Sequence, residues 1–87
     1  MKIFGRKFKL VYKKGDHADL HDCLGSCDTK KAEIFVQEDL PEREQLSVLF
    51  HEMLHAIWPE EGEEMINMRA RLIFEVLWEN DMIGFPK

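Results

Sequence analysis

The sequence lacks the long apolar run that a membrane-spanning helix requires. None of its apolar stretches approaches the roughly 18 residues of such a helix, and its first residues lack the apolar core of a secretory signal, which is roughly 7–15 residues long. Cysteine is scarce as well, with only Cys23 and Cys27, and without an export signal we expect both thiols to be reduced. The sequence therefore predicts a cytoplasmic protein without a membrane partner.

Basic residues are too few for a typical nucleic-acid-binding protein. The chain has 12 Lys and Arg against 17 Asp and Glu, a net charge of −5, whereas a phosphate backbone attracts a positive surface. The six basic residues between Lys2 and Lys14 are interpreted as the solvated face of a β-hairpin. We therefore expect no nucleic acid partner.

The length of 87 residues predicts a single domain over residues 1–87. A chain this short buries only about 60% of the surface that its unfolded form exposes, so its stability is expected to be modest. A metal ion that binds only the folded form would add its binding free energy to that stability.

The first third of the chain is predicted to form strands. Residues 2–11 are rich in Ile, Phe, Leu and Val, and residues 32–37 contain Ile, Phe and Val in succession. Residues 17–27 are ambiguous and could include a strand over residues 24–27. Two or three antiparallel strands are therefore expected in this part of the chain. Gly5 is expected to form either a turn or a bulge, and turns are expected at residues 13–16 and residues 28–31.

A helix is predicted to follow, beginning near Asp39 and ending at Trp58. Asp39 and Glu42 have the spacing of a capping box, with Asp39 as the N-cap, and Pro59 stops the helix. Its apolar positions recur every three or four residues, as in an amphipathic helix: they are Leu46, Leu49, Phe50, Met53, Leu54 and Ile57.

A second helix is predicted over Glu63 to Glu79, after an acidic loop at residues 60–62. Its expected core positions are Ile66, Ala70, Ile73 and Leu77, widened by Met65, Val76 and Trp78. Together these elements predict an α+β fold in which a small antiparallel β-sheet packs on two α-helices.

The first helix contains the motif His51-Glu52-Met53-Leu54-His55, which has the form H-E-x-x-H. Two histidines four residues apart lie on one face of a helix, and their imidazoles can bind one Zn²⁺ at about 2.0–2.1 Å each. On a helical wheel both histidines lie about 140–180° from the centre of the apolar stripe, so we expect them to face a cleft. Glu52 is predicted to be the general base and proton shuttle of a zinc hydrolase.

A catalytic zinc needs a third protein ligand and an open position, and no third histidine follows His55. Glu63 is favoured, because it lies three residues before Ile66 and falls on the inner side of the second helix. Glu64 is the alternative, about 100° further round towards solvent. Most of the acidic cluster is explained by the helix dipole, which favours acids in the first turn. The other candidates are Glu60, Glu61 and Glu75.

A second group of metal-binding residue types comprises His17, His21, Cys23 and Cys27. On an extended strand the two sulfurs would lie about 13 Å apart, too far for one metal ion. We interpret the group as buried thiols and loop histidines. Candidate donors for stabilising an oxyanion are Tyr12, His17 and His21.

Several segments form a pattern in chain order: Gly25-Ser26-Cys27-Asp28, Ala32-Glu33-Ile34-Phe35-Val36, Leu40-Pro41-Glu42, the His51 motif with Ala56-Ile57, Glu63-Glu64-Met65-Ile66 and Ala70. Over about residues 20–80 this pattern resembles the small phage and prophage metallopeptidase-like proteins related to the ImmA/IrrE group. The second helix departs from that group at Met68-Arg69-Ala70, where Arg-Leu-Ala is usual, and we expect no DNA-binding extension.

The resemblance implies a minimal zincin-like domain with zinc between the helices, a glutamate as third ligand, and a protein substrate such as a host or phage regulator. For a phage-encoded chain the compartment would be the host cytoplasm. The predicted function is zinc-dependent hydrolysis of peptide bonds, with the peptide added to a sheet edge at residues 32–37 or a neighbouring strand. The alternatives are a non-enzymatic phage interaction module with a structural zinc, and a helical scaffold without metal.

Overall fold

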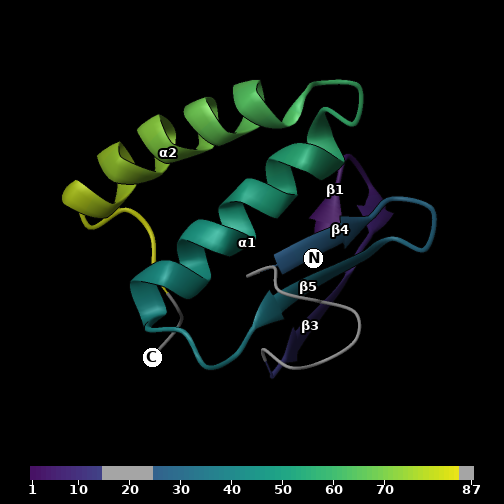
Figure 1. The fold of residues 1–87 in the computed structure, drawn as a ribbon, viewed down its shortest axis with the longest axis horizontal. Coiled ribbons are helices and arrows are strands. Elements are labelled where there is room, and N and C mark those ends of the chain that lie inside the picture. The colour runs from purple at the N-terminus through teal and green to yellow at the C-terminus, as the bar shows by residue number, and fades with distance from the viewer. Residues whose placement is uncertain (15–24, 85–87) are drawn as a thin grey trace.

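The computed structural model describes residues 1–14 and 25–84, and a three-stranded sheet lies at one side of the molecule (Figure 1). The strand order is β3 (Lys9–Lys13), β5 (Glu33–Gln37) and β4 (Gly25–Asp28). β5 pairs with β3 in parallel and with β4 in antiparallel fashion. Because Ile34, Phe35 and Val36 are all buried, β5 has the continuous apolar sequence of a strand covered on both faces, which suits its central place.

A two-stranded hairpin precedes this sheet, formed by β1 (Lys2–Ile3) and β2 (Arg6–Lys7). Gly5 has a φ of 84°, a conformation that glycine adopts without steric penalty, so the predicted turn at Gly5 is confirmed. The turn between β4 and β5 is confirmed as well, since Asp28 Oδ1 accepts hydrogen bonds from the backbone N–H groups of Lys30 and Lys31.

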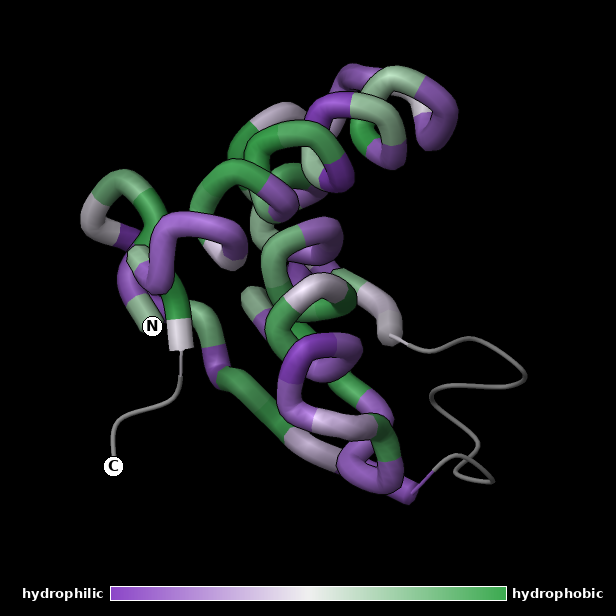
Figure 2. The backbone as a smooth tube through the Cα atoms, turned by 90° about the vertical axis from the view of Figure 1, so that its left-hand side faces the viewer, coloured by the Kyte–Doolittle hydropathy of each residue, from purple (hydrophilic) through white to green (hydrophobic). Residues whose placement is uncertain are grey.

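The two helices form two further layers. α1 (Glu42–Ile57) packs on β4 and β5, and α2 (Glu63–Glu79) packs against α1 on its other side (Figure 1). Apolar and polar segments alternate along both helices, as expected for amphipathic helices (Figure 2). The core between the sheet and α1 comprises Ile3, Phe8, Ile34, Val36 and Leu49, and that between the helices comprises Leu54, Ile66 and Ala70.

The predicted α+β class is confirmed, and two details of the arrangement differ from the expectation. The pairing of β3 with β5 is parallel, so the sheet is mixed. The sheet packs directly on α1, which in turn carries α2. Parallel and antiparallel partners need the same apolar residues in a strand, so the apolar pattern of β3 did not reveal its direction. Residues 15–24 lie outside the described part of the chain. They include most of the ambiguous segment 17–27 and the second half of the turn expected at residues 13–16.

The predicted capping of α1 by Asp39 is wrong. The N-cap is Pro41, two residues later, and no side chain caps the helix. Gln45 instead donates hydrogen bonds from Nε2 to the carbonyl oxygens of Glu38 and Leu40. Gln45, a residue of α1, therefore fixes the backbone of residues 38–40 before the helix. Asp39 belongs to this segment and lies outside the first turn.

The bounds of α2 agree with the prediction, and α1 ends at Ile57 with Trp58 as C-cap. The core stripe of α2 differs from the prediction, because Ile73 is 44% exposed while Phe74 is 2% exposed. The flanking residues Met65 and Val76, expected to widen the stripe, are exposed as well. Ile66, Ala70 and Phe74 follow a strict four-residue spacing, so they form one straight ridge towards α1. Phe74 meets the ring of Phe50 with 6.3 Å between the ring centroids. In the part of the chain that the structure describes, no helix has the length and apolar character to cross a membrane.

Gly25 allows β4 to lie close to α1. A Cβ atom at this position would lie 2.4 Å from Val48 Cγ1 and 2.9 Å from the carbonyl oxygen of Phe35, so any side chain would displace the strand or the helix. Close contact between backbone and helix is a common reason for glycine in a strand.

We therefore expect Gly25→Ala to destabilise the fold by about 1–3 kcal/mol, the usual range for overpacking. Urea unfolding would measure this loss. Gly84→Ala is the matched control, because its added Cβ would meet only Glu42 Oε1, at 4.0 Å. Equal unfolding midpoints for the two variants would contradict the close approach of β4 to α1.

Candidate metal centre

Two imidazoles project from neighbouring turns of α1 on the same side of the helix. His51 and His55 are both half-buried, and their Nε2 atoms lie 3.2 Å apart. The ring centroids are separated by 4.9 Å, with 64° between the ring planes. The four-residue spacing in the helix therefore directs both Nε2 atoms towards one point.

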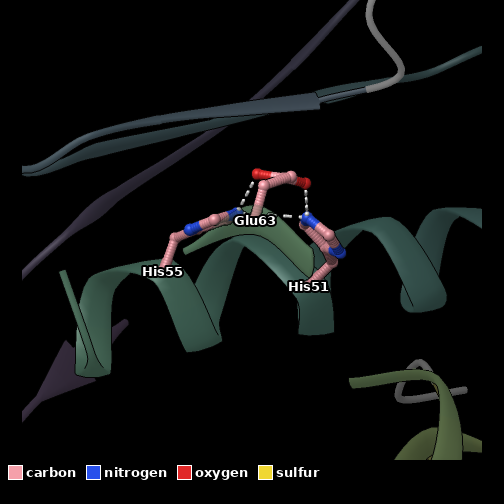
Figure 3. Close-up of side chains that lie close together, drawn as sticks. All are labelled: His51, His55 and Glu63. Carbon is pink, nitrogen blue, oxygen red and sulfur yellow. Dashed lines mark hydrogen bonds and ion pairs between the residues drawn. The ribbon is translucent and has the colours of Figure 1, made fainter. Parts of the chain in front are cut away.

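Glu63 reaches this point from the first turn of α2. The short loop after α1 turns the chain back, with the N–H of Glu61 donating to the carbonyl oxygen of Trp58. Glu63 Oε1 then lies 2.7 Å from His51 Nε2, and Oε2 lies 2.7 Å from His55 Nε2. Figure 3 shows the carboxylate spanning the space between the two imidazoles, with one oxygen directed towards a nitrogen of each ring.

The three side chains form a group that could hold a metal ion. One ligand atom from each of His51, His55 and Glu63 lies within 4.8 Å of the others. Around a tetrahedral zinc with bonds of about 2.1 Å, neighbouring ligand atoms are about 3.4 Å apart. The distances of 2.7 and 3.2 Å in the structure need only a small outward adjustment to reach this geometry. Two neutral imidazoles and one carboxylate are also a donor set that zinc accepts in proteins.

The other acidic candidates lie away from this group in the described part of the chain. Glu64 points into a separate hollow on α2. Glu61 lies 4.0 Å from Arg69, and Glu75 forms an ion pair of 2.5 Å with Arg43. Glu60 is exposed and does not belong to the group. The structure therefore brings Glu63, and not Glu64, to the two histidines, as the helical wheel predicted.

Glu52 is the buried acid beside the group, with an exposed fraction of 8%. Burial, and to a smaller extent the negative charge of Glu63, raises the pKa of its carboxyl to about 7. Burial disfavours the charged form of an acid, and so does a like charge nearby. A carboxyl that titrates near neutral pH can both accept and donate a proton under physiological conditions.

Hollows open on both sides of Glu52. The one beside His55 has a volume of about 340 Å³ and is also lined by Cys27, Thr29 and Pro59. The one beside His51 has a volume of about 430 Å³, and its further lining residues are Gly25, Ser47, Val48 and Asn67. Both hollows include Glu52 and Glu63, so the group lies where they meet.

Of the second group proposed from the sequence, the structure describes only Cys27. His17, His21 and Cys23 lie outside the described residues. Cys27 is not part of the metal-binding group, and burial raises the pKa of its thiol to about 11, with further contributions from Glu52 and Asp28. Tyr12 packs against the core between the sheet and α1 and lines neither hollow.

Three residues near the group were not predicted from the sequence. Ser47 precedes His51 by four residues, Asn67 follows Glu63 by four, and Thr29 begins the turn after β4. The helical spacing from the expected ligands could have identified Ser47 and Asn67. No comparable signal existed for Thr29, because its place depends on how β4 lies against α1.

Comparisons with family models, with curated proteins and with solved structures found no match to this chain.

We expect His51→Ala, His55→Ala and Glu63→Ala each to weaken Zn²⁺ binding by more than the 10–100-fold typical of changes outside the ligand set. Isothermal titration of the metal-free chain with Zn²⁺ would measure the affinities. Glu64→Ala is the control, because its side chain lies outside the group, and its affinity should match the wild type. Loss of binding in Glu64→Ala but not in Glu63→Ala would contradict the geometry.

The raised pKa of Glu52 predicts a pH-dependent difference between the metal-free wild type and Glu52→Gln. The folded protein keeps the proton up to about pH 7, whereas the unfolded chain loses it near pH 4.5. Wild-type stability should therefore fall relative to the variant as the pH rises through this interval, by on the order of 2–3 kcal/mol. Urea unfolding of both proteins at pH 4, 6 and 8 would measure the difference.

Glu64→Gln is the control for this experiment, because Glu64 is exposed. A stability difference between wild type and Glu52→Gln that stays constant with pH would contradict the buried environment of the carboxyl. A bound cation favours the charged form of a neighbouring acid, so saturating Zn²⁺ should shrink the difference at pH 8.

Proposed function

We propose that the protein is a zinc-dependent metallopeptidase that hydrolyses peptide bonds of a protein substrate. The observation that carries this proposal is the convergence of two imidazole nitrogens and one carboxylate beside a buried carboxyl group. Catalytic zinc sites use three protein ligands, among them the combination of two histidines and one glutamate, and leave a fourth position open. His51, His55 and Glu63 would be the ligands.

Bound zinc would supply Lewis acidity towards the scissile carbonyl and would activate a water molecule at neutral pH. Glu52 is the group that moves the proton. It accepts a proton from the attacking water and delivers it to the leaving amine. Its place at the meeting of the two hollows gives it access to both sides of a bound peptide bond.

The substrate would lie along β4. β5 pairs with a strand on each side, so its sheet edges are occupied and a peptide cannot add to residues 32–37. β4 is an outer strand in the described part of the sheet, and it is the outer strand that lines the hollows beside the metal group. Gly25 and Cys27 of β4 line the two hollows beside the metal group. An extended peptide can therefore add to β4 by main-chain hydrogen bonds and present its scissile bond to Glu52.

The resemblance to the ImmA/IrrE group supports a protein substrate of regulatory type, from the host or from a phage. We also propose a cytoplasmic place of action, which is the host cytoplasm if the chain is phage-encoded.

A structural zinc is the second candidate, and Cys27 is the observation that favours it. Its thiol borders the hollow that also contains His55 and Glu63. Thiolate is a preferred zinc ligand, and four protein ligands would close the site to water and substrate. The protein would then be an interaction module braced by the metal.

Glu52→Gln should abolish cleavage, with a loss of about 10² or more, while it keeps the zinc. The measurement is zinc-dependent fragmentation of a panel of unfolded proteins and host cell extract, followed by mass spectrometry. Cys27→Ser is the control and should cleave as the wild type does. Absence of cleavage by the zinc-loaded wild type, together with loss of zinc in Cys27→Ser, would establish the structural role in its place.

A further inference from the structure

A third hollow adjoins the metal centre along α2. It has a volume of about 300 Å³ and shares Asn67 with the hollow beside His51. α2 forms the outer layer next to α1 (Figure 1), and the residues that line this hollow are exposed in the described part of the chain. The remaining lining residues are Glu64, Met68, Arg71 and Leu72.

The helix fixes the distance between this hollow and the metal centre. Glu63, Asn67 and Arg71 follow one another at four-residue intervals, so they lie on successive turns along one side of α2. Arg71 is eight residues beyond Glu63, which corresponds to about 12 Å along the helix axis. An extended peptide covers that distance in about three or four residues.

Arg71 is the cation of this hollow. The other two arginines near the helices have acidic neighbours, since Arg43 pairs with Glu75 and Arg69 lies 4.0 Å from Glu61. Arg71 is exposed and has no hydrogen bond or ion pair with any residue that the structure describes. Its guanidinium is therefore free to bind a carboxylate through two parallel hydrogen bonds.

Apolar surface lies next to this cation. Met68 is 50% exposed and Leu72 is 61% exposed, and both side chains line the same hollow as Arg71. Exposed apolar side chains gathered beside a polar anchor are typical of a binding surface. A ligand that combines an acidic group with an apolar side chain would complement both features.

We propose that this hollow is a substrate-recognition subsite, which rests on the proposed peptidase function. Arg71 binds an acidic side chain three or four residues from the cleaved bond, on the His51 side of the metal centre. Met68 and Leu72 contact the apolar side chain next to that acid. Glu64 lines the same hollow, and Arg71 is the one basic residue among the described residues that line it, so the place of Arg71 sets the position of the acid.

The test is cleavage of a peptide library, prepared from a digested proteome, by the zinc-loaded enzyme, with the cut sites read by mass spectrometry. The wild type should favour Asp or Glu at the third or fourth position on one side of the cut. Arg71→Glu should lose this preference and favour Lys or Arg there. For an acidic peptide its KM should rise about five- to tenfold with kcat unchanged, because the contact is remote from the reacting atoms.

Arg69→Glu is the matched control, because Arg69 lies on the same helix beside Glu61 and does not line the hollow. It should keep the wild-type cleavage profile, and both variants should bind Zn²⁺ as the wild type does. Cleavage without an acidic preference, or an equal change in both variants, would overturn the subsite and leave the peptidase function standing. If the wild type cleaves no peptide, the peptidase function fails and the subsite fails with it.

Discussion

The packing of α1 on two partners is the constraint on which the site depends. One side of the helix is buried against the sheet through Leu49, and another is buried against α2 through Leu54. His51 and His55 lie half-buried between these two sides. They border hollows that are also lined by residues of β4 and by Glu63 of α2, so the edge strand and the carboxylate are brought to the histidines by the same packing that stabilises the fold.

The metal centre and the stability of the domain are coupled through charge. Without a cation, burial raises the pKa of Glu52, and the nearby carboxylate of Glu63 contributes to the same rise. A metal ion at the histidines would offset this repulsion and would link α2 to α1 through Glu63. In a chain of 87 residues with a small core, such a link would add to the stability of the layered fold.

Helical features were predictable from the sequence because side chains in a helix repeat every 3.6 residues. This regularity placed His51 beside His55 and set Glu63 on the inner side of α2, where the structure has them. Features that depend on contacts between distant segments were not predictable. Three examples are the parallel pairing of β3, the burial of Phe74 rather than Ile73, and the hydrogen bonds of Gln45 to the segment before α1, where a cap by Asp39 was expected.

One helix would serve both the chemistry and the recognition of the substrate. Glu63 lies in the first turn of α2, and Arg71 lies two turns later on the same side. A helix of packed residues is stiff, because its backbone hydrogen bonds fix a rise of about 1.5 Å per residue. The distance along the helix from Glu63 to the backbone of Arg71 therefore does not depend on loop conformation. A peptide anchored at Arg71 would be held with a limited set of bonds near Glu52, so a small domain without a deep pocket could still select where it cuts.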